Sequence, residues 1–262
     1  MILLSLWALL AVAAVIAVTI AVSRAQGRIV VVDVAWGLMF LAAALVVALV
    51  GDGTSWRRWL LLALVGVWSL RLAWHIGRRL GIHHSSGSRE DPRYEALMDG
   101  HDFSYALGRV FLVQAVAAFV ISWPVIAGAG STVDWPVLVW IGVAVWAIGL
   151  FFESVGDHQL SAYRAKPRDQ RPQVLDTGLW AWTRHPNYFG DACIWWGLWL
   201  AGGLASGWLP GLITIVSPAL MTLFVRNISG AKLLEKTMSQ RPGWDEYAAR
   251  VPMFFPRPPR RR

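Results

Sequence analysis

The stretch at residues 30–50 reads VVVDVAWGLMFLAAALVVALV and contains one charged residue, Asp33. A run of about 20 apolar residues is long enough to cross the hydrocarbon core of a bilayer as an α-helix. A helix is the expected form because it satisfies its own backbone hydrogen bonds in lipid. The stretch therefore predicts a membrane-spanning helix with one ionisable side chain inside the membrane.

Similar apolar stretches recur along the 262-residue chain, of which 56% is hydrophobic and 15% charged. Soluble domains carry about 25% charged residues. The 17 Trp residues suit the membrane–water interface. The sequence predicts an all-α integral membrane protein: one seven-transmembrane helix bundle at residues 1–255, with a basic, disordered tail at 256–262. The predicted spans are 2–22, 30–50, 57–78, 105–128, 135–153, 188–206 and 208–228.

Lys and Arg residues are distributed unevenly among the predicted loops. Nearly all of the 24 fall in alternate loops and the C-terminal tail, with only Arg57 and Arg58 in the other loops. The positive-inside rule then places the N-terminus outside and the C-terminus in the cytoplasm of a multi-pass cell-membrane protein. The net charge of +8 favours membrane lipids and a phosphate-bearing ligand as partners, and not nucleic acid.

A first polar cluster follows the fifth predicted span, on the cytoplasmic side. Glu153 and Asp157 are four residues apart, so they share one face of a helix. Arg164 comes seven residues later on roughly the same face, and Arg171 follows. Two acids and an Arg can bind a ribose and a phosphate together. The alternative is a solvated helix end with an ordinary ion pair.

A second polar cluster, TRHPNYFGD at residues 183–191, directly precedes the Trp-rich sixth span. Proline favours helix initiation, so the residues after it open the span. Asn187 and Asp191 are four residues apart and share a face. A capped helix start explains the acid but not the whole group of polar residues. The binding candidates in this cluster are Arg184, His185, Asn187, Tyr188 and Asp191.

Ionisable residues also lie inside the second and third spans. Arg71, His75 and Arg78 are spaced by four and three residues and form one polar stripe. Such groups normally face the bundle interior and pair, so we expect Asp33 to pair with Arg71 or His75. A His beside a carboxylate can polarise a carbonyl or deliver a proton. The alternative is a buried structural ion pair.

Several site types are not indicated. The single cysteine, Cys193, excludes an intramolecular disulfide and a multi-thiolate metal site. His83–His84 and His101–Asp102 fit no compact set of metal ligands, so we expect no metal. The chain contains no Rossmann or P-loop fingerprint. A nucleotide is therefore expected to bind between membrane helices and their cytoplasmic loops.

The segment GLWAWTRHPNYFGD at residues 178–191, followed by WWG at 195–197, resembles the C-terminal signature of the steroid 5-alpha-reductase superfamily. It is most similar to the bacterial branch of membrane proteins of unknown function. The elements Asp33-x-x-Trp36-Gly37 and Arg71-Leu-x-Trp74-His75 also suit that branch, so the resemblance covers most of the chain. It implies a seven-helix membrane reductase that uses NADPH to saturate a carbon–carbon double bond of a lipid or steroid-like substrate.

The resemblance also implies roles for individual residues. Glu153 departs from the steroid reductases, which have an amide-type residue there. Those enzymes place a Gln-Glu pair in span two and a Tyr in span three, and Asp33 and His75 occupy the comparable regions here. We therefore take Asp33 and His75 as the catalytic candidates. The cofactor-binding candidates are Glu153, Asp157, Arg164, Arg171, Arg184, His185, Asn187, Tyr188, Asp191 and Arg226.

A second family shares part of this pattern. Integral-membrane methyltransferases, such as those acting on isoprenylcysteine, carry an Arg-His-Pro-x-Tyr-x-Gly element and end in a Glu-rich helix followed by Tyr and Arg-Val-Pro. Glu235, Glu246-Tyr247 and Arg250-Val251-Pro252 look similar. That resemblance implies S-adenosylmethionine as the alternative cofactor. A non-enzymatic lipid-binding or transport protein is the third alternative. The reductase is preferred over the methyltransferase because it gives Asp33 and His75 a role. It is preferred over transport because the polar groups cluster on one side of the membrane.

Overall fold

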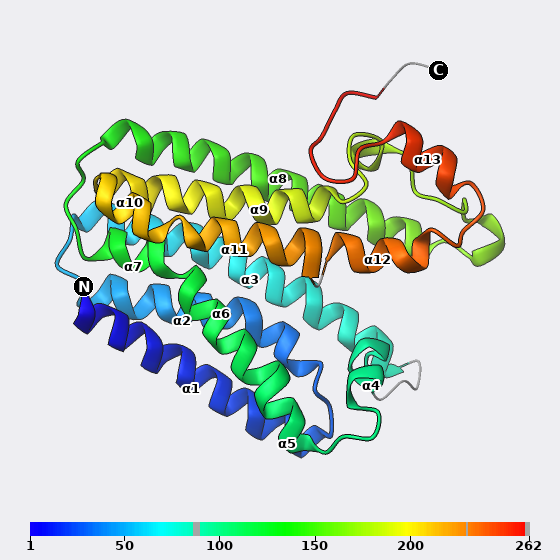
Figure 1. Ribbon diagram of the computed structural model, residues 1–262, viewed down its shortest axis with the longest axis horizontal. Helices are drawn as coiled ribbons and strands as arrows, with labels where there is room; N and C mark the ends of the chain where they lie inside the picture. The colour runs from blue at the N-terminus through cyan, green and yellow to red at the C-terminus, as the bar shows by residue number, and fades with distance from the viewer. Residues whose placement is uncertain (86–89, 229, 260–262) are drawn as a thin grey trace. The chain divides into compact units, whose positions relative to one another are not determined.

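The computed structural model describes residues 1–85, 90–228 and 230–259. Within those ranges the secondary structure is helical, with no strand (Figure 1). The chain divides into two compact units, Met1–Pro136 with Ala201–Thr214 and Val137–Leu200 with Ile215–Arg262. We refer to them as unit 1 and unit 2 and describe each by itself. The single membrane domain at 1–255 stays a prediction.

Unit 1 is built around α2, which packs against α1 on one side and α3 on the other. Gly27 ends α1 in the left-handed conformation, with φ 63°, which a residue without Cβ adopts at little cost. The helices of unit 1 are α1 (Ile2–Gln26), α2 (Val31–Val50), α3 (Ser55–Ser85), α4 (Pro92–Met98), α5 (Phe103–Ala106), α6 (Val113–Ile121), α7 (Trp123–Ala129) and α10 (Trp208–Thr214), with a π-helical turn at Leu107–Leu112 and a 3-10 turn at Leu204–Ser206.

Arg57, at the start of α3, is fully buried within unit 1. Its guanidinium donates to the carbonyl oxygens of Gly128 at 2.8 Å and Ser131 at 2.8 Å, and to the hydroxyl of Ser206 at 2.9 Å. These acceptors lie at the end of α7 and before α10, where helix ends leave backbone groups unpaired. Arg57 therefore joins the start of α3 to the end of α7 and to the turn before α10.

Unit 2 contains the helices that follow. They are α8 (Pro136–Ala165), α9 (Pro186–Leu198), α11 (Val216–Leu223), α12 (Ala231–Met238) and α13 (Trp244–Arg250). Shorter 3-10 turns occur at Arg168–Gln170 and Gly178–Ala181, and a π-helical turn at Phe224–Ile228. A further π-helical turn, Trp199–Gly203, begins in unit 2 and ends in unit 1. Within the unit, α9 packs against α11 and against the π-helical turn Phe224–Ile228, which follows α11.

Six helices are long and apolar enough to cross a membrane, which is consistent with an integral membrane protein. They are Ile2–Gln26, Val31–Val50, Ser55–Leu80, Phe103–Ile121, Pro136–Ala165 and Trp208–Met238. The sixth predicted span, 188–206, is not among them. It forms most of α9 and the turns after it, and its Asp191, Gly and Trp residues lower its hydropathy.

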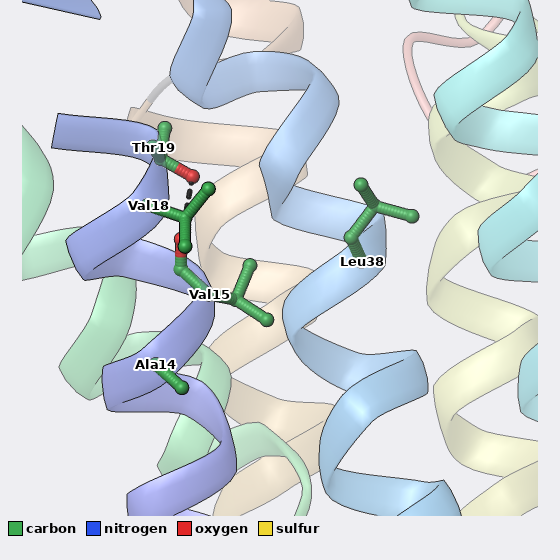
Figure 2. Close-up of a pocket in the computed structure, with 5 residues that line it drawn as sticks. All are labelled: Ala14, Val15, Val18, Thr19 and Leu38. Atoms are coloured by element: carbon green, nitrogen blue, oxygen red, sulfur yellow. Dashed lines mark hydrogen bonds between the residues drawn. The ribbon is translucent and has the colours of Figure 1, made fainter. Parts of the chain in front are cut away.

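A shallow groove of about 350 Å³ lies between α1 and α2 in unit 1 (Figure 2). Its lining is Ala14, Val15, Val18, Thr19 and Leu38. The Thr19 hydroxyl donates to the carbonyl oxygen of Val15 at 2.8 Å, so this polar group is already used. The groove therefore suits hydrocarbon and does not suit a nucleotide.

Candidate functional site

Close packing between α8 and α9 positions the acidic candidates in unit 2. A Cβ on Gly190 would lie 2.5 Å from the carbonyl oxygen of Gly149 and 2.5 Å from the backbone nitrogen of Glu153. A Cβ on Gly197 would lie 2.6 Å from the carbonyl oxygen of Gly142. Distances this short leave no room for a side chain, so glycine is required at these positions. The two backbones therefore touch directly, and side chains next to the glycines are brought together.

Asp157 and Asn187 meet at this contact. Asn187 Nδ2 donates to Asp157 Oδ1 at 3.0 Å. Asp157 is 7% exposed and Glu153, one turn earlier on α8, is 4% exposed. Gly156 provides the space, because a Cβ there would lie 3.2 Å from the backbone nitrogen of Asn187. The predicted shared face of Glu153 and Asp157 is thus turned toward the start of α9.

The amide of Asn187 has a defined orientation. An ionised carboxylate only accepts hydrogen bonds, so the atom that faces Asp157 must be the NH₂ group. The amide oxygen, Asn187 Oδ1, is buried and has no hydrogen-bond partner in the part of the chain that the structure describes. Buried polar atoms are nearly always paired. The site therefore offers carboxylate and amide oxygens and needs a donor from elsewhere.

The basic candidates after α8 separate into two kinds. Arg164 is exposed in the last turn of α8. Arg171 donates to the carbonyl oxygens of Arg164 at 2.5 Å and Lys166 at 2.7 Å, and its guanidinium lies 5.4 Å from the centre of the Tyr163 ring. Arg171 therefore satisfies carbonyls at the C-terminal end of α8, which gives it a structural role beside the predicted one.

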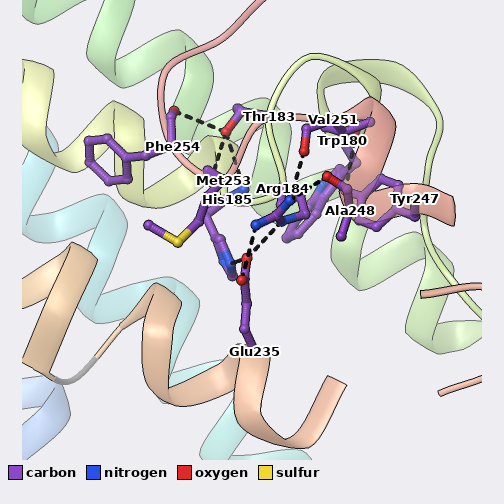
Figure 3. Close-up of polar contacts among 10 residues, drawn as sticks. All are labelled: Trp180, Thr183, Arg184, His185, Glu235, Tyr247, Ala248, Val251, Met253 and Phe254. Atoms are coloured by element: carbon purple, nitrogen blue, oxygen red, sulfur yellow. Dashed lines mark hydrogen bonds and ion pairs between the residues drawn. The ribbon is translucent and has the colours of Figure 1, made fainter. Parts of the chain in front are cut away.

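Arg184 joins the predicted signature to the C-terminal helices (Figure 3). Its Nε and Nη2 donate to the two carboxylate oxygens of Glu235 at 2.8 and 3.1 Å. Its Nη1 donates to the carbonyl oxygens of Ala248 at 2.9 Å and Val251 at 2.8 Å. A guanidinium has five N–H donors, so most of them are engaged within the protein. Arg184 therefore connects the residues before α9 with α12 and α13. We call these contacts of Arg184 with Glu235, Ala248 and Val251 the clamp.

His185 belongs to the same network. Its Nε2 lies 3.0 Å from Glu235 Oε1, its ring stacks on Tyr188 with centroids 5.6 Å apart, and it is 1% exposed. The hydroxyl of Thr183 donates to the carbonyl oxygen of Phe254 at 2.9 Å. Thr183 and Arg184 thus contact the segment that follows α13, and Arg184 and His185 contact α12 through Glu235. Their role in cofactor binding stays a prediction.

The remaining candidates of unit 2 lie on α9 and on the turn after α11. Asp191 is half-buried, one turn after Asn187. Arg226 is exposed on the π-helical turn Phe224–Ile228, which packs against α9. The structure therefore brings Glu153, Asp157 and Asn187 together and places Asp191 and Arg226 on neighbouring elements of the same unit.

In unit 1, Asp33 is held by two residues that the sequence analysis did not consider. Arg93 Nη2 donates to Asp33 Oδ2 at 2.9 Å, and the Tyr94 hydroxyl donates to Asp33 Oδ1 at 2.6 Å. Gln114 Nε2 donates to the Tyr94 oxygen at 3.4 Å. Burial, and then the charge of Asp33, raises the pKa of Tyr94 well above its usual value, so this phenol keeps its proton. The partners follow Asp33 by 60 and 61 residues, a separation that no local pattern reveals.

The other predicted residues of unit 1 are placed as follows. Arg71 and His75 are half-buried on α3, and both have contacts within the protein. His101 stacks on Tyr105 with ring centroids 3.9 Å apart. The side chains of His83 and His84 lie outside the described residues. Within the described residues, no group of three His, Cys, Asp or Glu side chains could hold a metal ion.

Comparison with known proteins matches nearly the whole chain to one family. The family model described as "Protein of unknown function (DUF1295)" matches residues 19–251. A Schizosaccharomyces pombe protein, "Uncharacterized protein C594.04c", is 24% identical over 252 aligned residues, which cover 86% of this chain and 72% of the relative. No solved structure matches the chain. Because the family match includes every element from Asp33 to Arg226, the chain belongs to the DUF1295 family.

Proposed function

We propose that this protein is a membrane-embedded, NADPH-dependent reductase that saturates a carbon–carbon double bond of a lipid or steroid-like substrate. One observation supports the cofactor most strongly. Glu153, Asp157 and Asn187 form a buried group of acceptors at the contact of α8 with α9, and Asn187 Oδ1 is left without a donor. Such a group suits a ligand with several hydroxyl and N–H donors, as a ribose diol and an amide provide.

The residue types of unit 2 fit a dinucleotide phosphate. Asp157 and Glu153 would accept hydrogen bonds from ribose hydroxyls, and Asn187 would accept one more. Arg164 and Arg226 are exposed cations that a phosphate can reach from water. They would bind phosphate oxygens. The resemblance to the steroid 5-alpha-reductase superfamily favours NADPH as this ligand. When bound, NADPH supplies a hydride.

A reductase also requires a proton source, and Tyr94 in unit 1 is a candidate for it. The Tyr94 hydroxyl is bonded to Asp33 at 2.6 Å, and its raised pKa keeps it protonated. Hydride addition to one carbon of an enone double bond leaves an enolate, with carbanion character at the neighbouring carbon. The enolate is far more basic than a phenolate, so a phenol can protonate it. We therefore add Tyr94 to Asp33 and His75 as a catalytic candidate. The variant Tyr94→Phe tests it, because it should bind NADPH normally and form no product.

The proposal includes the cytoplasmic side of the cell membrane as the site of cofactor binding. NADPH is water-soluble and carries phosphates, so it requires a face with aqueous access and positive charge. Exposed Arg164, Lys166, Arg168, Lys232 and Lys236 provide that charge in unit 2. The positive-inside rule assigns such a face to the cytoplasm.

A second candidate function is S-adenosylmethionine-dependent methyl transfer. It is favoured because the residues that the chain shares with the membrane methyltransferases contact one another in unit 2. Glu235 binds Arg184 and His185, and Arg184 also binds the carbonyl oxygen of Val251 and donates its backbone N–H to Pro252 O at 2.9 Å. This assembly gives the shared residues a common structural role, which both enzyme classes could use. It is ranked second because it assigns no role to Asp33 and Tyr94.

Ligand binding to the detergent-purified protein tests the proposal. NADPH is expected to raise the melting temperature, because binding to the folded state stabilises it by mass action. Asp157→Ala and Asn187→Ala should each remove one side of a buried hydrogen bond and weaken NADPH binding about 5- to 150-fold, or about 1–3 kcal/mol. A thermal-shift titration with NADPH, NADP and S-adenosylmethionine measures this.

Exposed residues of the same types serve as matched controls. Asp169→Ala and Gln170→Ala change an acid and an amide on the surface turn Arg168–Gln170 and should leave the shift unchanged. Stabilisation by S-adenosylmethionine alone would overturn the reductase in favour of the second candidate. Normal NADPH binding by both Asp157→Ala and Asn187→Ala would overturn the site assignment.

A further inference from the structure

Asn227, like Asn187, has a buried side-chain oxygen with no hydrogen-bond partner among the described residues. It is half-buried on the π-helical turn Phe224–Ile228. Turns of this kind interrupt α-helices rarely and are frequent at functional sites. The chain returns closely after this turn, because a Cβ on Gly230 would overlap the carbonyl oxygen of Val225. The backbone around Asn227 is therefore tightly constrained, and it holds the Asn227 side-chain oxygen where no described residue pairs with it.

Two contacts locate Asn227 along α9. Trp196 Nε1 donates to the Thr222 hydroxyl at 3.2 Å, and His185 lies 3.0 Å from Glu235. The later segment therefore runs antiparallel to α9, and Asn227 comes between these two contacts. The π-helical turn that contains it packs against α9.

At this level α9 carries Asp191, one turn beyond Asn187. The acidic face of α8 meets α9 at Asn187, through the bond to Asp157. The level of Asn227 along α9 is therefore about one helical turn from Asn187, and the amide oxygens of both residues are buried without a partner among the described residues. A buried amide without a partner lowers stability, so its retention points to a ligand that pairs with it.

The chemistry of an asparagine side chain defines that ligand group. An amide presents an N–H donor beside a carbonyl acceptor. Its complement is a group with the same two functions side by side, as found in a carboxamide or along the amino-bearing edge of adenine. An ionised phosphate only accepts hydrogen bonds and does not provide this combination.

We propose that Asn227 is a further cofactor-binding residue, which pairs through its side-chain amide with the amino-bearing edge of the nucleotide. The proposal rests on the proposed function, because it assigns one part of the same ligand. The edge belongs either to the carboxamide of the nicotinamide half or to the adenine of the adenosine half. Asn187 receives a separate donor from the same ligand.

The test titrates the full-length purified protein with NADPH and with its two halves, reduced nicotinamide mononucleotide and adenosine bisphosphate. Asn227→Ala is expected to weaken NADPH binding about tenfold, the effect of one lost hydrogen bond in a buried site. Asn227→Ala should weaken the binding of one half by the same factor and leave the binding of the other half unchanged. The half that is affected contains the group that pairs with Asn227. Gln240→Ala, an exposed amide after α12, is the matched control and should bind normally.

The outcomes separate the inference from the proposed function. Normal binding of NADPH and both halves by Asn227→Ala, while Asp157→Ala loses binding, overturns the role of Asn227 alone. Failure of the unchanged protein to bind NADPH overturns the proposed function and this inference with it. If Asn227→Ala does not fold, the isosteric Asn227→Asp decides. It lacks the NH₂ donor, so weakened binding supports the proposal and normal binding overturns it.

Discussion

Replacing Arg184 with Ala should detach the C-terminal helices from α9 and lower the free energy of unfolding by about 3 kcal/mol, the usual cost of breaking a buried ion pair. The side chains of Arg184 and Glu235 are 12% and 19% exposed, so both are largely removed from water. The change leaves the carbonyls of Ala248 and Val251 without this donor, and it leaves His185 as the remaining partner of the Glu235 carboxylate. Thermal unfolding, together with trypsin cleavage after the exposed Lys236, measures the effect.

A double-mutant cycle separates the clamp from a direct role in binding. Arg184→Ala with Glu235→Ala should be less destabilising than the sum of the single changes, because no unpaired charge remains. Arg250→Ala removes the exposed ion pair with Asp176 and should cost at most about 1 kcal/mol. An Arg184→Ala protein of unchanged stability that has lost NADPH binding would show instead that Arg184 binds the ligand directly.

The second large effect is expected from Gly190→Ala. The added methyl group would lie 2.5 Å from backbone atoms of Gly149 and Glu153, which cannot rotate away as a flexible side chain can. Helices α8 and α9 must then separate, at a cost of about 1–3 kcal/mol. Because the separation moves Asn187 away from Asp157, NADPH binding should be lost as well. Thermal unfolding and ligand titration of the same sample measure both effects.

The same substitution elsewhere provides the control. A Cβ on Gly77 in α3 would have no neighbour within 4 Å. Gly77→Ala should therefore leave stability unchanged or raise it by up to about 1 kcal/mol, through the higher helix propensity of Ala. Equal stability of Gly190→Ala and Gly77→Ala would contradict the close approach of α8 and α9.

The helical, membrane-type character of the chain could be predicted from composition and apolar length. Six of the seven predicted spans coincide with helices long and apolar enough to cross a membrane. The sixth span escapes that criterion because it opens with polar residues that belong to the candidate site. Its polarity signals function more clearly than membrane insertion, so the same residues that mark the site weaken the evidence for a span.

The close contact between α8 and α9 has a signal in the sequence, the spacing of its glycines. Glycines occur every seven residues at 142, 149 and 156 on α8 and at 190 and 197 on α9. Seven residues are close to two helical turns, so such glycines lie on one face and permit backbone contact. By contrast, the partners of Arg184 and Asp33 are 51 and 60 residues away. No local periodicity predicts pairs that only tertiary packing brings together.

Group transfer to the lipid tests the central claim most directly. Membranes containing the protein are incubated with NADPH that carries deuterium at the transferable position, S-adenosylmethionine with a labelled methyl group, and a mixture of enone lipids. A reductase adds one deuteride from the donor and one proton from solvent across the double bond. We predict deuterium in the saturated lipid, dependent on Asp157, and no labelled methyl group. A lipid that gains the labelled methyl group and no deuterium would contradict the account.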